Sequence, residues 1–179
     1  MPEIEIRPAA LTDLSILSNL DSNYQSEYVW QMDRTFDEGQ TIITFRDVRL
    51  PRIVRVEPPH RLTLTSEDTG GNSIILAARM MGELVGYIRI VENQIPGVGW
   101  MTDLVVHQEI RRHGIGSALI WAGQDWAASK GFRRLICDVQ SKNHAAIRLM
   151  FKLGYEFCGY NDYYYANKDI ALFFTRFLR

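Results

Sequence analysis

The sequence has few cysteines and no excess of charge of either sign. Of its 179 residues only Cys137 and Cys158 are cysteines, which is too few for a disulfide framework and typical of reduced thiols in a cytoplasmic protein. Twenty Lys and Arg balance 21 Asp and Glu, for a formal net charge of -1. Without a general basic field, binding to a nucleic acid is disfavoured.

Long apolar runs are also absent. The longest are short pieces such as residues 73–78, far below the roughly 20 residues that a membrane-spanning helix needs. The N-terminal segment Met-Pro-Glu-Ile-Glu-Ile-Arg carries acids where a signal peptide requires a basic head and an apolar run. We therefore expect a cytoplasmic protein that spans no membrane and is not exported.

Hydrophobic residues make up 46% of the chain and charged residues 23%, as in an ordinary globular domain. Period-two alternation and short apolar runs predict strands. The predicted strands are residues 3–7, two edge-like strands within 41–60, a hairpin of 73–79 and 84–91, then 98–106 and 134–139, and a final hairpin of 155–166 and 170–178 that turns at 167–169.

Apolar stripes at helical spacing predict three helices. A short first helix begins near Thr12, whose hydroxyl is placed to cap it. The second covers residues 115–130. The third covers 146–153 and ends at Gly154, a natural C-terminal stop.

The strand at 98–106, the second helix and the strand at 134–139 occupy about forty residues, the size of a right-handed βαβ unit. These two strands should run parallel, whereas the hairpins on either side make antiparallel pairs. We expect one mixed α+β domain over residues 1–179, without linkers or repeats.

The loop before the second helix has the composition of an anion-binding site. Gly114 and Gly116 let the backbone approach a ligand closely, and amides at a helix N-terminus carry the positive end of the helix dipole. Arg111 and Arg112 add charge, which favours a pyrophosphate over a single carboxylate. The alternative is a turn whose glycines only permit tight packing.

Two nucleotide-binding motifs fit this loop poorly. A Walker loop needs Gly-Lys-Ser/Thr, and here Gly116 is followed by Ser117 and Ala118. A Rossmann fingerprint needs three glycines and here there are two, although Asp138 lies near the place of its acidic residue. A nucleotide-binding protein that uses the loop alone is one alternative function.

The loop supplies a first motif, Arg111-x-x-Gly114-x-Gly116. A second motif follows it as Asn143-x-x-Ala146-Ile147-x-Leu149 and then Lys152-Leu153-Gly154-Tyr155-Glu156. Together, over residues 100–156, the two motifs resemble the GNAT superfamily of acyl-CoA-dependent N-acetyltransferases. The resemblance implies a mixed, mostly antiparallel sheet flanked by helices and splayed between its fourth and fifth core strands, with the pantetheine of acetyl-CoA in the opening.

The resemblance also assigns cofactor-binding residues. Leu104 and Val106 belong to the strand whose backbone pairs with pantetheine, and the amide of Val105 or Val106 can donate to the oxyanion of the tetrahedral intermediate. Asn143 matches a cofactor-contacting Asn, and Met150 lies seven residues later on the same helix face, near the cofactor sulfur. The pyrophosphate cradle consists of Arg111, Arg112, His113, Gly114, Ile115, Gly116 and Ser117.

Met150 departs from the family pattern, which often has a tyrosine here to protonate the departing thiolate. Another hydroxyl can take this role, with Tyr155 as the first candidate, or the thiolate leaves unaided, as a thiol pKa near ~8.5 permits. The missing tyrosine also suits an alternative function, a noncatalytic acyl-CoA-binding or regulatory module on the same fold.

An amine acceptor must lose a proton before it attacks the thioester, because an alkylammonium titrates near ~10.4. Asp103 is the first candidate base, followed by Glu92 and Glu27. The alternative for Asp103 is a local hydrogen bond at the strand end. The histidines are not clustered, so we expect no metal site.

Residues 21–38 contain five acids and a single Arg, interleaved with aromatic rings. Such a segment suits a cationic ligand, and in the GNAT superfamily the segment after the first helix commonly borders the acceptor pocket. Glu27, Tyr28 and Asp33 are therefore the candidate acceptor-binding residues. The alternative is a solvated helix surface, with an uncharged amine or a peptide N-terminus as the acceptor.

The run Tyr163-Tyr164-Tyr165 and the later Asp169-Ile170-Ala171-Leu172-Phe173-Phe174 are similar to the end of streptothricin acetyltransferases, although they are too short to name a substrate. The five tyrosines of residues 155–165 fit the core, a homodimer surface or the acceptor pocket equally well. The arginine-spaced residues 46–55 are typical of a solvated edge, with a homodimer interface or an acidic partner as the alternatives. The sequence thus predicts an acetyl-CoA-dependent N-acetyltransferase that acts on a small, cationic primary amine by direct attack in a ternary complex.

Overall fold

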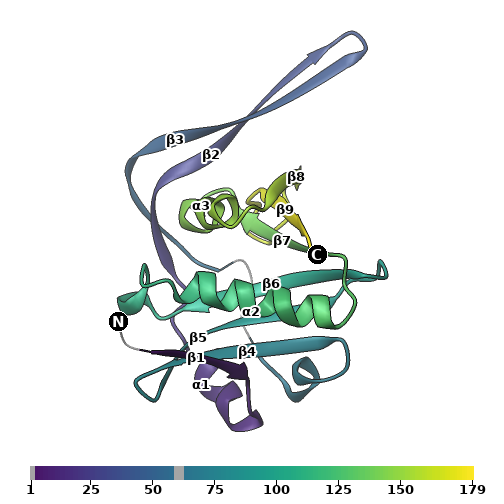
Figure 1. Cartoon of the computed structure of the whole chain (residues 1–179). Coiled ribbons are helices and arrows are strands. Elements are labelled where there is room, and N and C mark those ends of the chain that lie inside the picture. Colours follow the sequence, from purple (N-terminus) through teal and green to yellow (C-terminus); the bar gives the residue numbers. More distant parts are fainter. Residues whose placement is uncertain (1–2, 59–62) are drawn as a thin grey trace.

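The computed structural model describes residues 3–58 and 63–179. They form a seven-stranded sheet, ordered β1-β4-β5-β6-β7-β9-β8, and a separate two-stranded ribbon (Figure 1). The strands of the sheet are β1 (Ile4–Pro8), β4 (Ser73–Met80), β5 (Glu83–Glu92), β6 (Val98–Val106), β7 (Arg134–Gln140), β8 (Glu156–Asn161) and β9 (Ala171–Phe177). The ribbon consists of β2 (Tyr24–Asp37) and β3 (Gln40–Val56), and the helices are α1 (Leu14–Ser18), α2 (Ile115–Ser129) and α3 (His144–Lys152).

The sheet is mixed and mostly antiparallel. β6 and β7 run parallel, joined through α2 as the βαβ spacing predicts, and the other neighbouring strands are antiparallel. The predicted α+β class and the parallel pair are therefore confirmed.

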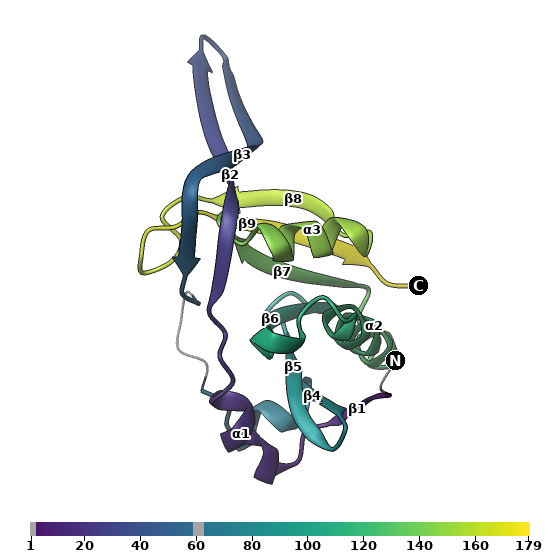
Figure 2. The ribbon, with the colours of Figure 1, turned by 90° about the vertical axis from the view of Figure 1, so that its left-hand side faces the viewer.

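Alternation along the strands divides the core between the two faces of the sheet. On one face, Ile88 of β5 packs in a cluster with Leu119 of α2 and Ile147 of α3. On the other face, Tyr87 of β5 packs in a second cluster with Leu17 of α1. Figure 2 shows α1 and α2 on opposite sides of β4 and β5. We call these the α2 face and the α1 face.

The local stop signals that the sequence predicts are confirmed. The β4–β5 hairpin turns at Met81 and Gly82, and α2 and α3 end just before Gly131 and Gly154. Gly131 and Gly154 have φ of 80° and 74°, the left-handed conformation that commonly ends a helix.

The predicted cap at Thr12 is wrong. The chain first makes a 3-10 turn at Leu11–Asp13, and it is the Asp13 carboxylate that accepts the Ala10 amide at 2.8 Å. Arg7 donates to the same Asp13 oxygen at 2.7 Å. The guanidinium keeps this carboxylate in place and lowers its pKa, so the acid takes the capping role in place of the hydroxyl.

Residues 41–60 were expected to form two strands, and this expectation is wrong for the described part. β3 is one strand from Gln40 to Val56, paired along β2. Pro51 is tolerated because the register shifts around it: Ser26 pairs with Val54 and Tyr28 with Arg49, which leaves the proline in an irregularity where no ladder N–H is needed. Residues 59 and 60 lie outside the described residues.

The C-terminal hairpin is confirmed as a pairing, but its first strand is shorter than predicted. β8 ends at Asn161, and a loop then runs to β9. Side chains bend this loop through local bonds, since Asp162 Oδ1 accepts the Tyr163 amide at 3.0 Å and Asn167 Oδ1 accepts the Asp169 amide at 3.0 Å. Such bonds compete with a strand ladder.

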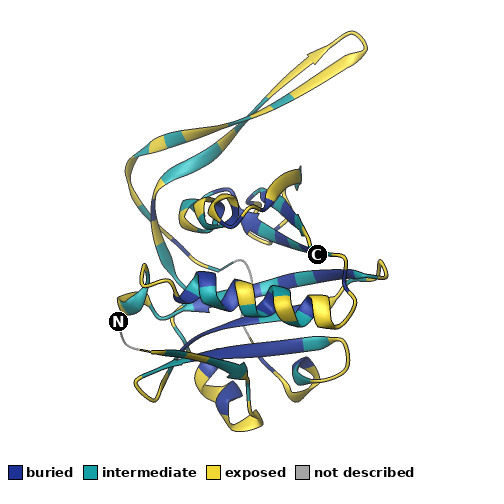
Figure 3. Cartoon of the chain, viewed as in Figure 1, coloured by how far each residue is buried: buried dark blue, intermediate teal, exposed yellow. Residues whose placement is uncertain are grey.

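The ribbon runs past α3 and extends beyond the body of the molecule (Figure 1). The Trp30 amide donates to the Ser141 carbonyl at 2.9 Å, and the Trp30 ring lies 5.5 Å from the Phe151 ring of α3. Toward the tip the ribbon is exposed (Figure 3), including Phe36, which is 72% exposed. One half of the ribbon is thus part of the body and the other half projects from it.

Candidate active site

The sheet opens between β6 and β7. The two strands pair from Val98 with Arg134 to Met101 with Cys137 and then separate, although β6 continues to Val106. Figure 2 shows the two halves of the sheet diverging. Within the described residues, β5 is the single strand that pairs with the far end of β6, so one edge of β6 offers its backbone groups to an extended ligand. The predicted splay between these strands is confirmed.

A β-bulge lies where the strands separate. Ile90 pairs with Met101 and Arg89 with Asp103, which leaves Thr102 as an extra residue in β6. Bulges bend a strand and re-aim its groups, and they are frequent beside active sites. The splay and the bulge therefore occupy the same place in the fold.

The loop after β6 leads to a helix start that can bind an anion. Arg112 and Gly114 have φ of 71° and 84°, and Gly114 is the N-cap of α2. No side chain caps this 15-residue helix. Its first amides and the positive end of its dipole are therefore available to a negatively charged group.

Arg111 holds this loop in position through the hydrogen bonds of its guanidinium. Its Nε donates to the Val106 carbonyl at 2.9 Å, and its Nη1 and Nη2 donate to the carbonyls of Asn23 and Asp21 at 2.9 and 3.1 Å. The guanidinium thus joins the end of β6 to the segment that leads into β2. Arg112 is exposed, and it is the arginine of the pair whose charge faces solvent.

The other predicted loop residues fall into two groups. His113 is exposed and its Nδ1 lies 3.1 and 3.0 Å from the carbonyls of Ile110 and Arg111. Ile115 and Ser117 are buried in the first turn of α2. A Cβ on Gly116 would lie 3.4 Å from Leu149 of α3, an ordinary contact distance, so α2 and α3 pack side by side here.

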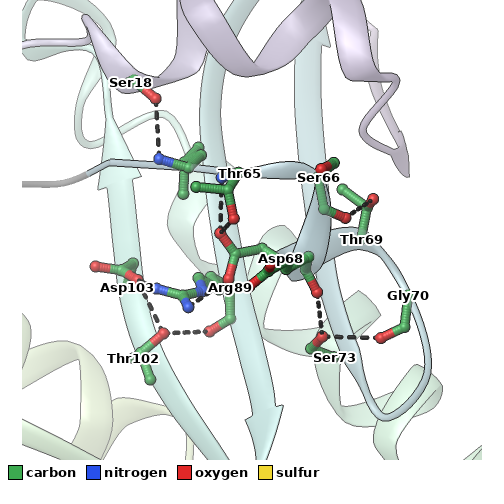
Figure 4. A network of polar contacts seen from close by, with 12 residues as sticks. Ser18, Thr65, Ser66, Asp68, Thr69, Gly70, Ser73, Arg89, Thr102 and Asp103 are labelled. Atoms are coloured by element: carbon green, nitrogen blue, oxygen red, sulfur yellow. Dashed lines mark hydrogen bonds and ion pairs between the residues drawn. The ribbon is translucent and has the colours of Figure 1, made fainter.

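The strand residues alternate between the two faces. Leu104 and Val106 are half-buried against the α2-face cluster, whereas Val105 belongs to the α1-face cluster. Asp103 is buried. Like Arg89, its partner in the ladder of β5 and β6, it lies on the α1 face of the sheet (Figure 4).

Asn143 precedes α3 and Met150 lies within it, on the α2 face. Asn143 is the N-cap of α3, and its Oδ1 accepts the Ala146 amide at 3.1 Å. Met150 is 1% exposed, and its Sδ lies 3.5 Å from the Sγ of Cys137. Since Cys137 is the last β7 residue that pairs with β6, Met150 packs against the point where the strands separate.

Tyr155 lies in the core between α2 and the sheet. Its side chain is 2% exposed, and its hydroxyl accepts a hydrogen bond from Gln124 Nε2 of α2 at 3.2 Å. Burial raises the pKa of Tyr155 to about 12. The hydroxyl is therefore fixed by a structural hydrogen bond on the α2 face.

Asp103 takes part in a charged network on the α1 face (Figure 4). Its Oδ2 accepts from Thr102 Oγ1 at 2.8 Å and lies 3.5 Å from Arg89 Nη1. Arg89 also pairs with Asp68, whose carboxylate accepts the Thr65 amide at 2.8 Å. The candidate base is thus one of two acids that share an arginine.

The acids of the ribbon pair with basic residues of the facing strand. Asp33 Oδ2 lies 2.5 Å from Arg46 Nη2, and Glu27 Oε2 lies 3.7 Å from Arg49 Nη2. Tyr28 stacks on His144 of α3 with ring centroids 4.8 Å apart. The three candidate acceptor residues therefore lie along the ribbon, and the charge of its acids is offset by arginines that follow in β3.

Sequence reasoning gave no acceptor role to Asp138, although the structure places it at the opening. Asp138 follows Cys137 directly, so it is the first β7 residue beyond the pairing with β6. Its Oδ1 accepts from Trp100 Nε1 at 2.9 Å and its Oδ2 from the Tyr165 hydroxyl at 2.7 Å. Strand alternation around Cys137 was the signal available for its orientation.

A splayed mixed sheet with an open strand edge beside an uncapped helix start can hold an extended ligand that carries an anionic group. Residues 40–155 match the family model described as the acetyltransferase (GNAT) family. The chain belongs to the acetyltransferase (GNAT) family.

Individual relatives agree with this assignment. The chain is 25% identical over 167 residues to streptothricin acetyltransferase of Streptomyces lavendulae, covering 90% of this chain and 86% of that protein. A 34% identical match to the uncharacterized N-acetyltransferase YobR of Bacillus subtilis covers 34% of this chain and 25% of that protein. A crystal structure from Bacillus anthracis, provisionally named a streptothricin acetyltransferase and in complex with acetyl coenzyme A, is similar with a TM-score of 0.83, 18% identity and 99% coverage of both chains.

In residues 3–58 and 63–179, no group of three or more His, Cys, Asp or Glu could hold a metal ion. In the same part of the chain, no helix combines the length and apolarity needed to cross a membrane.

Proposed function

We propose that the protein transfers the acetyl group of acetyl-CoA to a primary amine of a small, cationic acceptor by direct attack in a ternary complex. The single observation that carries this proposal is the coincidence of the splay, the bulge at Thr102 and the open edge of β6. It supplies one place where an extended thioester and an acceptor can meet. Membership of the GNAT family supports the acyl transfer itself.

The residues present fit the co-substrate. The uncapped start of α2, with Gly114 at its N-cap, would hold the diphosphate, and Arg112 would add positive charge there. The open edge of β6 from residue 103 to 106 would pair with the pantetheine amides. A backbone amide of Val105 or Val106 would stabilise the oxyanion, since such a donor needs no side chain.

The proton steps follow from the side chains near the bulge. Asp103, one residue after Thr102, is the proposed base that takes the amine proton, directly or through water. We infer that the thiolate leaves without a side-chain acid, because Met150 has no proton and the Tyr155 hydroxyl is held by Gln124 in the core. A thiol pKa near ~8.5 makes such a departure feasible.

Streptothricin is the first acceptor to test, because a relative similar over 90% of the chain is named for it. Purified protein with acetyl-CoA would be given streptothricin, a linear diamine, an alkyl monoamine and a peptide with a free N-terminus, and thiol release would be followed. Turnover that is fastest with a cationic small molecule is expected. Turnover with the peptide alone would contradict the proposal.

A noncatalytic acyl-CoA-binding module is the second candidate, and the absence of the usual tyrosine at Met150 favours it. Calorimetry of acetyl-CoA binding distinguishes the two. Binding without thiol release for any amine would assign the chain to the second class.

A further inference from the structure

Asp138 occupies the place where the strands of the opening first separate. Its neighbour Cys137 contacts Met150 on the α2 face. Because successive side chains of a strand point to opposite faces, Asp138 is on the α1 face of β7. Asp138 is half-buried. It accepts a hydrogen bond from Trp100, which lies in the part of β6 that pairs with β7.

Aromatic rings gather around this carboxylate. Trp100 and Tyr165 donate to its two oxygens. The Trp100 and Phe173 rings lie 5.9 Å apart, Tyr164 and Phe173 5.6 Å, and Tyr164 and Tyr165 5.0 Å. Tyr164 is 44% exposed, so this cluster of aromatic rings can be reached from solvent. Ring faces next to a carboxylate attract a cation.

Asp138 also differs from the buried acids of the protein. Asp13 pairs with Arg7, Asp68 with Arg89, and Asp169 with Lys142 at 2.6 Å. Within residues 3–58 and 63–179, no Lys, Arg or His forms an ion pair with Asp138. Its two neutral donors fix its orientation but leave its charge uncompensated.

We propose that Asp138, with the rings of Trp100, Tyr164 and Tyr165, binds an alkylammonium group of the acceptor and so determines its specificity. The site would take a primary ammonium carried on a short apolar chain, since the carboxylate supplies the charge and the rings supply apolar and cation–π contacts. A divalent metal is a poor alternative because a single carboxylate supplies too few ligands. This inference rests on the proposed transfer to an amine, and it names the group that holds the acceptor.

The first test measures binding without turnover. The indole N–H resonance of Trp100, assigned with the Trp100→Phe variant, would be followed by NMR during titration with n-butylammonium chloride, with n-butanol as the uncharged probe. The ammonium should shift the Trp100 resonance and the alcohol should not. In Asp138→Asn the affinity for n-butylammonium should fall at least tenfold. Asp125→Asn, which removes an exposed acid of α2, should behave as the wild type.

A second variant preserves the test if Asp138→Asn does not fold. Tyr164→Leu keeps the carboxylate and removes an exposed ring, and it should weaken n-butylammonium binding about threefold to tenfold, in line with the loss of a cation–π contact. An unchanged ammonium response in the folded Asp138→Asn variant, or equal responses to ammonium and alcohol, would overturn the inference.

Kinetics separates this inference from the proposed function. With any amine that turns over, Asp138→Asn should raise the acceptor KM at least tenfold and leave the dissociation constant of acetyl-CoA unchanged. Ammonium binding without turnover of any amine would retain the site and remove the proposed reaction. Turnover with an unchanged acceptor KM in Asp138→Asn would retain the reaction and remove the site.

Discussion

The segment from β6 to α3 and the ribbon of β2 and β3 are positioned by different kinds of contact. In the first, turns and helix ends occur at glycines such as Gly114 and Gly154, and β6, α2 and β7 follow one another as a βαβ unit. In the second, the Tyr24 hydroxyl donates to Gln140 Oε1 at 2.8 Å, 116 positions later, and Arg34 pairs with Asp162 across 128 positions. The turns and helix ends of the cofactor side are therefore specified locally, whereas the placement of the ribbon depends on the completed fold.

The two regions also differ in the charged and polar groups that they present. The loop before α2 presents backbone amides at an uncapped helix start. The ribbon presents acids that are paired with arginines on the facing strand. Variants in each region should consequently change different measurements.

The largest effect is expected for Gly114→Pro in the cofactor loop. Proline requires a φ near −65°, whereas Gly114 has φ of 84°, so the helix start must rearrange. We expect acetyl-CoA affinity to fall by about a hundredfold, or ~2.7 kcal/mol, measured by calorimetry. Gly116→Val should weaken binding less, because residue 116 lies within α2 and its φ, unlike that of Gly114, is not positive, so that only the added methyl groups must fit beside Leu149.

The matched control is Gly39→Pro at the ribbon tip. Gly39 also has a positive φ, 72°, and a Cβ there meets no atom within 4 Å. Backbone strain at this position should leave acetyl-CoA binding unchanged. Equal losses of affinity at Gly39 and Gly114 would remove the distinction between the two regions.

Trp30→Ala should detach the ribbon without disturbing the cofactor side. The Trp30 ring lies 5.5 Å from Phe151 and 6.3 Å from Phe45 and Phe157, and loss of such a half-buried ring destabilises local packing by about 2–3 kcal/mol. Limited trypsin cleavage within β3 should become faster, with acetyl-CoA affinity unchanged. Phe36→Ala at the exposed tip is the control and should alter neither.

Tyr155→Phe should change how stability depends on pH. Burial raises the pKa of Tyr155 to about 12, so the folded protein keeps a proton that the unfolded chain loses near pH 10. This contribution is present below about pH 10 and is lost as pH rises toward 12. The variant loses the Gln124 hydrogen bond, about 1 kcal/mol at neutral pH, and its denaturation midpoint should fall less steeply between pH 10 and 12.

Met150→Leu should have a small effect on rate. A volume-conserving apolar swap destabilises by under about 1.5 kcal/mol, and no acid is lost. We expect the maximal rate to stay within about tenfold of the wild type, or ~1.4 kcal/mol of barrier. A hundredfold loss of rate in the folded variant would show that the thioether itself is required.

The smallest effect is expected for Glu27→Gln combined with Asp33→Asn. These side chains are 50% and 45% exposed and pair with Arg49 and Arg46, and exposed ion pairs of this kind contribute ~1 kcal/mol or less. The acceptor KM should change less than about threefold. A tenfold increase with an unchanged acetyl-CoA KM would instead assign the acceptor site to the ribbon, as the sequence suggested.

Local patterns were sufficient to predict most of the sheet and the cofactor loop. Strand alternation, the glycine stops and the βαβ spacing involve neighbouring residues, so α2, α3 and the β4–β5 hairpin could be placed from the sequence. The continuous β3 could not be, because the irregularity that accepts Pro51 exists only in the pairing with β2. The sequence also did not predict that β8 ends at Asn161, because the chain is bent there by side-chain hydrogen bonds of Asp162 and Asn167.

The site was predicted less completely than the fold. The sequence pointed to the loop at Gly114 but not to the hydrogen bonds from Arg111 to the carbonyls of Asp21 and Asn23. It singled out Asp103, whose pairing with Arg89 becomes visible only when β5 and β6 lie side by side. Asp138 had no local signal that separated it from an ordinary strand residue, because its aromatic neighbours come from β6, β9 and the loop before β9.

Because Thr102 is an extra residue in β6, its deletion would remove the bulge itself, which no substitution at this position can do. Met101 pairs with Ile90 and Asp103 with Arg89, so removal of Thr102 would join two positions that are already in register with adjacent partners. Every side chain beyond the deletion would keep its face, and β6 would become a regular strand. The shortened chain would thus separate foldability from catalytic competence: a natural relative lacking this residue should fold normally and have lost the reaction.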